Sequence, residues 1–230
     1  MSNFEEQRQR MIESQLAARG LRDQRVLKAV YAVPREEFVS PDLTGYAYRD
    51  SPLPIDASQT ISQPYIVALM AAALELKPDD RLLEIGAGSG YAAAVLAGLC
   101  KDVFTIERHK ILAESAGERL QRLGFHNVKV KHGDGTLGWP EVAPFDAIVV
   151  AAGGPQVPEP LKQQLTIGGR LVIPVGESVN SQTLLRVRRK GENEFVYEDL
   201  GGVRFVPLVG AAGWEDETAS RPASGSSKKA

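Results

Sequence analysis

The sequence predicts an α/β fold: a doubly wound, mostly parallel seven-stranded sheet covered by helices, with a helical extension at the N-terminus. Three observations lead to this prediction. Short apolar runs alternate with amphipathic segments between residues 79 and 176. The run at 145–150 is nearly all apolar, as in a strand buried on both faces. A glycine-rich turn at 86–90 joins the first apolar run to a helix of small residues.

Length and composition favour a single domain over residues 1–212. The chain has 230 residues and a net charge of −2, which argues against a broad basic surface for nucleic acid. The polar N-terminus and the short apolar runs predict neither a signal peptide nor a membrane span. The single cysteine, Cys100, excludes an internal disulfide and fits a reducing compartment, and the three histidines show no metal-ligand spacing. We therefore expect a cytoplasmic monomer without a metal.

The first 78 residues are predicted to form helices and a long loop. Apolar residues at helical spacing indicate helices around 11–16 and 26–31, which Gly20 separates and Pro34 ends. Several prolines mark 34–57 as a loop. A third helix follows Pro64, a residue that suits a first helical turn.

The remaining residues are predicted as a core of alternating strands and helices, followed by antiparallel strands. The expected core strands are residues 82–85, 103–106, 128–131, 145–150 and 170–175, and the expected helices are residues 91–99, 111–120 and 158–165. In 177–212, residues 183–189 alternate apolar and charged, and 195–206 look extended with a kink at Gly201 and Gly202. Residues 213–230 are small and polar and are predicted to be disordered.

The turn at 86–90 indicates a small-molecule site. Gly86, Gly88 and Gly90 allow positive φ and a close approach of backbone to a ligand. Their spacing is G-x-G-x-G rather than the G-x-G-x-x-G of dinucleotide sites, and Glu84 stands two residues before them. A carboxylate there would repel a pyrophosphate and suit an ammonium group. The alternative is a tight strand-to-helix turn without a ligand.

Two further acidic residues follow the next two strands. Glu107 ends the second strand about 20 residues beyond the turn, where an acid can accept hydrogen bonds from ribose hydroxyls. Asp134 lies between two glycines after the third strand, where it could accept from an adenine amino group. Each also has a plain interpretation: Glu107 as a solvated strand end, and Asp134 as a turn residue. Ligands of doubly wound sheets bind at such strand ends, so the three acids together predict a nucleoside pocket.

The stretch 83–91 resembles motif I of the S-adenosylmethionine-dependent methyltransferases, and 144–150 and 165–172 resemble the family's fourth- and fifth-strand motifs. The resemblance implies the Rossmann-like fold of that family and S-adenosyl-L-methionine as cofactor. It places Glu84 toward the methionine amine, Glu107 on the ribose and Asp134 on the adenine. The residues that it assigns to the cofactor are Glu84, Gly86, Ala87, Gly88, Gly90, Glu107, Asp134, Gly135 and Ile61.

Four other stretches, 53–65, 33–39, 132–135 and 203–209, resemble the protein-L-isoaspartate O-methyltransferases. This resemblance implies methyl transfer to the α-carboxylate of isoaspartyl residues in damaged proteins and peptides, followed by closure to a succinimide and repair. It implies that the substrate contacts Ala57, Thr60, Val206, Pro207 and Leu208. The chain departs from the family pattern at Asp56 and Ser58, where glycine is usual.

The chemistry of this reaction suggests Ser62 as the catalytic residue. An α-carboxyl group ordinarily has a pKa of about 3.3–3.7, so at neutral pH it is already an anionic nucleophile and needs no base. Charge diminishes as it meets a cationic sulfonium, so neutral hydroxyl and N–H donors position it better than an ion pair would. Ser62 could instead be the N-cap of the third helix, and residues 206–208 a core strand. Other functions stay open: methylation of a small molecule or nucleic acid, or sensing of the cofactor without catalysis.

Overall fold

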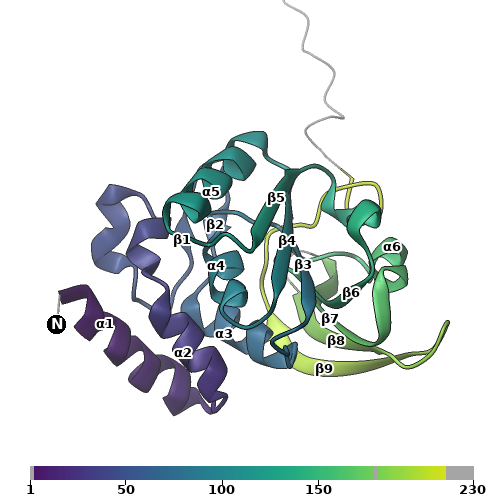
Figure 1. The fold of residues 1–230 in the computed structure, drawn as a ribbon, viewed down its shortest axis with the longest axis horizontal. Coiled ribbons are helices and arrows are strands. Elements are labelled where there is room, and N and C mark those ends of the chain that lie inside the picture. Colours follow the sequence, from purple (N-terminus) through teal and green to yellow (C-terminus); the bar gives the residue numbers. More distant parts are fainter. Residues whose placement is uncertain (1–2, 179–180, 216–230) are drawn as a thin grey trace, which may run out of the picture.

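The computed structural model describes residues 3–178 and 181–215. Its centre is a seven-stranded sheet in the order β5-β4-β3-β6-β7-β8-β9 (Figure 1). Strands β5 to β7 pair in parallel, and β8 and β9 are added antiparallel, which confirms the predicted fold class. The strands are β3 (Arg81–Ile85), β4 (Asp102–Glu107), β5 (Val128–His132), β6 (Phe145–Val150), β7 (Leu165–Ser178), β8 (Ser181–Arg189) and β9 (Phe195–Val203).

Successive residues of the central strands enter two separate apolar clusters. Leu82 and Val103 belong to the cluster shared with the N-terminal helices, whereas Leu83 and Phe104 belong to the cluster on the other face. This alternation follows from the period of two in a strand, and because both faces are covered the strands read as continuous apolar runs.

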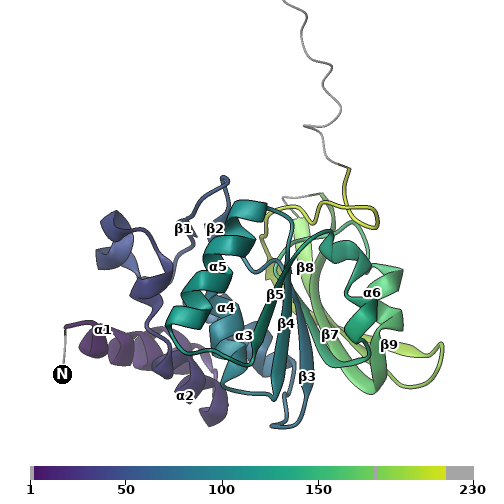
Figure 2. The ribbon, with the colours of Figure 1, turned by 45° about the horizontal axis from the view of Figure 1, so that its top comes forward.

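The helices cover the two faces unequally (Figure 2). On one side lie α3 (Pro64–Ala73), α4 (Tyr91–Ala97) and α5 (Lys110–Arg122), and on the other lies the short α6 (Glu159–Gln163). The strand order reverses between β3 and β6, with β4 and β5 following on one side of β3. Such a switch point leaves a crevice at the carboxyl ends of the strands.

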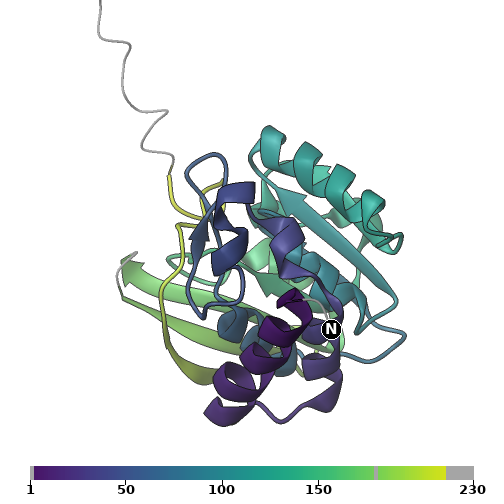
Figure 3. The same cartoon turned by 90° about the vertical axis from the view of Figure 1, so that its left-hand side faces the viewer.

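The N-terminal extension packs outside α3 and α4 (Figure 3). It contains α1 (Asn3–Met11), a π-helical turn (Ile12–Leu16), a 3₁₀ turn (Ala17–Arg19) and α2 (Gln24–Ala32). Gly20 separates the two helices with a φ of +90°, and the Asp23 carboxylate caps α2 by accepting from the backbone N–H groups of Arg25 and Val26.

Residues 34–57, predicted as a loop, contain two 3₁₀ helices, Arg35–Phe38 and Pro41–Tyr46, and the short strand β1 (Leu53–Pro54). The prediction missed these elements because a single turn is too short to show a hydrophobic period. The chain also stays anchored beyond residue 212, since the Trp214 indole N–H donates to the Gly153 carbonyl at 2.9 Å. The predicted tail therefore starts too early at Gly213, and residues 216–230 lie outside the described residues. None of the described helices has the length and apolarity to cross a membrane.

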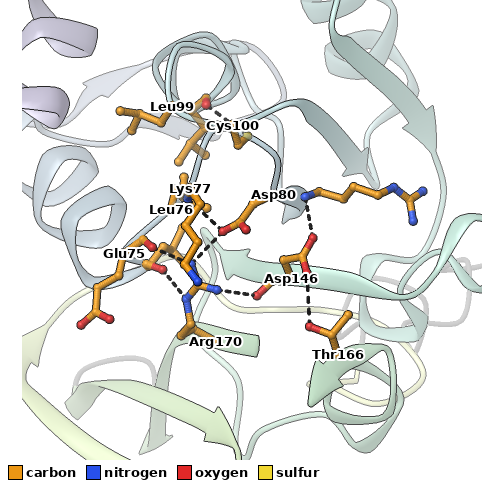
Figure 4. Close-up of polar contacts among 12 residues, drawn as sticks. Glu75, Leu76, Lys77, Asp80, Leu99, Cys100, Asp146, Thr166 and Arg170 are labelled. Carbon is orange, nitrogen blue, oxygen red and sulfur yellow. Dashed lines mark hydrogen bonds and ion pairs between the residues drawn. The ribbon is translucent and has the colours of Figure 1, made fainter. Parts of the chain in front are cut away.

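A buried ionic network ties α3 to the amino ends of the strands (Figure 4). The Arg170 guanidinium on β7 contacts the Asp80 carboxylate at 2.8 Å, and it donates to the carbonyls of Leu74, Glu75 and Asp146. Arg170 and Asp80 are 6% and 7% exposed, so neither charge is well solvated. The network lies at the amino ends of the strands, opposite the crevice. We therefore assign it a structural role.

We predict that Arg170→Leu lowers the free energy of unfolding by about 3 kcal/mol or more, because it leaves the buried Asp80 carboxylate without its partner. The exposed ion pair between Arg122 and Glu37, 3.0 Å apart, provides the control. Arg122→Ala should change the free energy of unfolding by less than about 1 kcal/mol. Urea unfolding measures both. Equal effects of the two substitutions would contradict the structural role of the network.

Candidate active site

The glycine turn follows β3 at the switch point. Gly86, Gly88 and Gly90 have φ values of +94°, +52° and +88°, in the left-handed region that favours glycine. The ladder between β3 and β4 continues into the turn, because Gly86 N–H donates to the Ile106 carbonyl at 2.8 Å. On the outside, Arg119 of α5 donates to the Ser89 carbonyl at 2.8 Å and holds the turn against that helix. The turn is thus fixed by backbone and side-chain contacts on both sides.

A cavity of about 240 Å³ opens beside this turn at the carboxyl ends of β3 and β4. We call it the inner cavity. Of the residues predicted to hold a cofactor, Ile61, Gly86, Ala87, Gly88, Glu107 and Gly135 line it. Gly90 does not line the cavity; it is the N-cap of α4 and lies close to the Leu120 side chain.

Glu107 lines the inner cavity with a carboxylate that is already oriented. One oxygen accepts from Gly88 N–H at 2.9 Å and the other from His109 N–H at 2.9 Å. The residue is 5% exposed. Each carboxylate oxygen has a second lone pair, so two further donors can be accepted.

Glu84 is buried behind the inner cavity. One carboxylate oxygen accepts from the Thr105 hydroxyl at 2.6 Å, and the other has no hydrogen-bond partner. Burial, with a smaller contribution from nearby Glu107, raises the pKa of Glu84 to about 8, against the lowering effect of the Thr105 hydrogen bond. Glu84 lines a chamber of about 30 Å³ that shares Ser62, Val67, Ala92 and Ala151 with the inner cavity. The chamber has room for about one water molecule or a small polar group.

Asp134 lies outside the residues that line the inner cavity. Its carboxylate accepts from Thr136 N–H at 2.8 Å, from the Thr136 hydroxyl at 2.7 Å and from Ala211 N–H at 2.8 Å. It therefore ties the C-terminal segment to the end of β5. The neighbouring Gly135 does line the cavity, and a Cβ there would overlap the side chain of Ile85.

A hairpin of β1 and β2 (Thr60–Ile61) covers the cavity. Its turn places Ala57 and Ser58 at φ values of +54° and +56°, so the left-handed positions are these two rather than Asp56. The hairpin touches the glycine turn, since a Cβ on Gly88 would meet the side chain of Ile55 at 3.5 Å.

Ser62 leaves the hairpin toward α3 and lines the inner cavity. The N-cap position of α3 is occupied by Gln63, without a side-chain capping bond. The N-cap interpretation of Ser62 is therefore wrong. Its hydroxyl forms no hydrogen bond with any residue that the structure describes.

The segment 203–208 forms the opposite wall. Val206 C=O and Leu208 N–H pair with Gly153, each at 2.8 Å, and the Gln182 amide bonds both backbone groups of Phe205. Within the described part of the chain, Val206 N–H and Pro207 C=O are left without a partner. Only Leu208 is fully buried, so the segment is a cavity wall rather than a strand inside the core.

A second and larger cavity of about 1100 Å³ adjoins the first; we call it the outer groove. The residues shared by the inner cavity and the outer groove are Thr60, Ser62, Ala151, Val206 and Pro207, and all are uncharged. The two cavities therefore form one site in two parts, and Ser62 is one of the residues at their junction.

Comparison with known proteins identifies the family. A family model described as protein-L-isoaspartate(D-aspartate) O-methyltransferase (PCMT) matches residues 6–213. The chain belongs to this family. It is 60% identical over 214 residues to protein-L-isoaspartate O-methyltransferase 2 of Pelobacter propionicus, across 93% of this chain and 95% of that protein. It is 55% identical over 210 residues to the protein-L-isoaspartate O-methyltransferase of Protochlamydia amoebophila, across 91% and 100%.

Two solved structures resemble this methyltransferase over most of its length. A protein-L-isoaspartate O-methyltransferase has a TM-score of 0.80 and 32% identity, across 90% of this chain and 67% of that one. A Plasmodium falciparum protein of the same type, in complex with S-adenosyl-L-homocysteine, has a TM-score of 0.75 and 26% identity, across 91% and 99%. The second shows that a protein of this fold and family holds the product of the cofactor.

Three residues that support the site in this methyltransferase were not predicted from the sequence. Thr105 holds Glu84, Arg119 holds the glycine turn, and Gln182 clamps Phe205. Thr105 could have been found from strand register, since it is the direct β4 neighbour of Glu84. The other two act across more than 20 residues and carry no local signal.

We predict that ionisation of Glu84 makes the ligand-free methyltransferase less stable as pH rises. Between the ordinary pKa of about 4.5 and the raised value of about 8, the folded carboxyl keeps a proton that the unfolded chain has released. The free energy of unfolding therefore falls across this window and levels off above it. Glu84→Gln should remove about 2 kcal/mol of the decrease between pH 6 and pH 8, measured by urea unfolding. The same pH dependence in both proteins would show that Glu84 titrates normally.

We predict that the hairpin turn is strained by its two non-glycine residues. Ser58→Gly should raise the free energy of unfolding by up to about 1 kcal/mol, because a left-handed backbone is unfavourable for serine and not for glycine. Asp56→Gly is the matched control and should lower it by about 0.5 kcal/mol, since that position has an ordinary φ. Thermal or urea unfolding compares them. Destabilisation by both substitutions would contradict the strain.

Proposed function

We propose that this methyltransferase transfers a methyl group from S-adenosyl-L-methionine to the α-carboxylate of L-isoaspartyl residues in proteins and peptides. The observation that supports it most is the two-part site. An inner cavity lined by the oriented carboxylate of Glu107 meets an outer groove large enough for a polypeptide, and the residues that both share are uncharged. Family membership and the name of the relatives supply the acceptor.

The residues present fit the cofactor. The Glu84 carboxylate has a buried oxygen without a partner, as expected if a cationic amino group completes it. Glu107 is oriented with spare lone pairs for the ribose hydroxyls, and Gly86, Ala87 and Gly88 let the backbone pass close beside it. Asp134 would contribute on the adenine side of the cofactor by fixing the backbone at Gly135, which lines the inner cavity. When bound, S-adenosyl-L-methionine supplies a methyl group from a cationic sulfonium, and the sulfur leaves as a neutral thioether.

We propose that Ser62 orients the substrate carboxylate, aided by Thr60 and backbone near Ile61. The Ser62 hydroxyl is free to donate, and it stands where the two cavities meet. No cation lies among the shared residues, so the carboxylate would keep its nucleophilicity instead of being stabilised in an ion pair. Positioning in a restricted space is then the main catalytic contribution of the protein.

The polypeptide around the isoaspartate would lie in the outer groove. Pro207 C=O offers an acceptor to an extended peptide that lies along Val206, in the manner of strand addition, with Leu208 behind them. The strained turn at Ala57 would bring the hairpin over the same peptide. After transfer, the neutral ester is a better leaving group than a carboxylate, so the adjacent amide closes to a succinimide, and its opening returns some normal aspartate.

The setting that we propose for this activity is the cytoplasm, with the enzyme acting as a monomer on damaged proteins and peptides and not on nucleic acid. One domain over residues 1–212 would hold both halves of the site, with the N-terminal 78 residues supplying the hairpin. Cys100 is a free thiol, as is usual for cysteines in a reducing compartment.

Transfer of labelled methyl groups to paired peptides tests the function. One peptide contains L-isoaspartate, and its partner has normal aspartate at the same position. The proposal expects methyl ester on the first peptide only, with release of S-adenosyl-L-homocysteine. Equal labelling of both, or of neither, would refute it.

We predict that Ser62→Ala lowers kcat/KM for the isoaspartyl peptide about 10- to 100-fold, the value of one hydrogen bond to a charged group. The KM for S-adenosyl-L-methionine should change less than about twofold, since Glu84 and Glu107 are untouched. Ser14→Ala, a serine of the π-helical turn outside both cavities, serves as the matched control. Steady-state kinetics with wild-type values in Ser62→Ala would remove Ser62 from the mechanism.

A further inference from the structure

The charged residues that line the outer groove all have the same sign. Among the described residues that line it, Arg19 and Arg204 carry charges, and none carries a carboxylate. The charged side chains that line the groove are therefore both positive. The two arginines differ in how much of that charge is available.

Arg19 is already paired. Its guanidinium lies 2.6 Å from the Asp50 carboxylate and stacks on the Tyr65 ring, 3.4 Å from the ring centroid. The carboxylate offsets most of its charge, and the stacking holds its side chain in place. Arg19 forms part of the groove wall but has little charge left to offer a peptide.

Arg204 has no such partner. Its side chain is exposed and forms no ion pair or hydrogen bond with any described residue. The acids of the preceding strand are occupied elsewhere, since Glu198 pairs with Arg186 and Asp199 accepts from Gly201 N–H. Arg204 also stands two residues before Val206, on the segment that would pair with the peptide. Residues two positions apart on an extended strand lie on the same face, and each lies beside its neighbour on the paired strand, so a substrate residue close to the isoaspartate would come beside Arg204.

We propose that Arg204 is a specificity determinant that makes this methyltransferase favour isoaspartyl substrates with an acidic residue near the isoaspartate. The inference rests on the proposed function and adds a preference to it. A solvent-exposed ion pair changes affinity only a fewfold, and a like-charge pair opposes it by a similar amount. Peptides with glutamate and with lysine at the same flanking position should therefore differ in kcat/KM by about three- to tenfold at low salt.

Arg204 is placed to act on the flank of the substrate rather than on the reacting carboxylate. It lines the outer groove and is absent from the lining of the inner cavity, whereas Ser62 lines both. Its loss should alter the ranking of charged flanks more than the turnover of a substrate with neutral flanks. This separates a specificity determinant from a group that binds the isoaspartyl carboxylate itself.

The test uses isoaspartyl peptides with glutamate, glutamine or lysine two residues before, or two residues after, the isoaspartate. Two series are needed because a peptide can pair with the segment in either direction. In wild type, one series should rank glutamate above glutamine above lysine, and the ratio should shrink as salt is added. Arg204→Ala should bring the three peptides within about twofold, and Arg204→Glu should reverse the order. Lys28→Glu, the same charge change on an exposed residue of α2, should keep the wild-type order.

The outcomes separate the two proposals. Turnover of the glutamine peptides without a charge preference in either series would overturn the role of Arg204 and leave the proposed function intact. Equal loss on all three peptides in Arg204→Ala would also overturn it, because Arg204 would then act on the isoaspartyl carboxylate. Failure of wild type on every isoaspartyl peptide would overturn both.

Discussion

Parallel pairing of β3 with β4 is the interaction on which the rest of the site depends. Its register sets Glu84 opposite Thr105, which explains the hydrogen bond between their side chains, and it continues past the strands as the bond from Gly86 N–H to Ile106 C=O. The next link is Gly88 N–H to the Glu107 carboxylate. A shift of one residue would turn Glu84 toward the opposite face of the sheet and break this series. One strand pair thus positions both the Glu107 carboxylate, which lines the inner cavity, and the Glu84 carboxylate behind it.

The second half of the site comes from segments that are far from this pair in sequence. The β1–β2 hairpin lies before β3, and the segment 203–208 follows β9, yet both line the inner cavity and the outer groove. Gly153 joins the later segment to the end of β6 through two backbone hydrogen bonds, and Trp214 donates to the same glycine. The sheet therefore acts as a frame on which the two walls are mounted, and Ser62 lies where they meet.

The parts of the fold that follow from periodicity could be predicted from the sequence. Continuous apolar runs predicted the buried strands, and Gly86, Gly88 and Gly90 predicted the left-handed turn. The short 3₁₀ helices at 35–38 and 41–46 could not be predicted, because they bury their residues without a repeat. Among site residues, motif spacing led to the carboxylates of Glu84 and Glu107 but not to their partners, which depend on strand register and on long-range packing. Asp134 shows the limit most clearly, since its two partners include Ala211, 77 positions away.

A structure determined with both S-adenosyl-L-homocysteine and an isoaspartyl peptide bound would test the two-part site most directly. We expect the nucleoside in the inner cavity with its ribose hydroxyls on Glu107, and the peptide extended along Val206 and Pro207 in the outer groove. The isoaspartyl carboxylate should lie within hydrogen-bond distance of the Ser62 hydroxyl and face the sulfur. A peptide bound away from the outer groove, or a carboxylate held by an arginine or lysine instead of Ser62, would contradict this account.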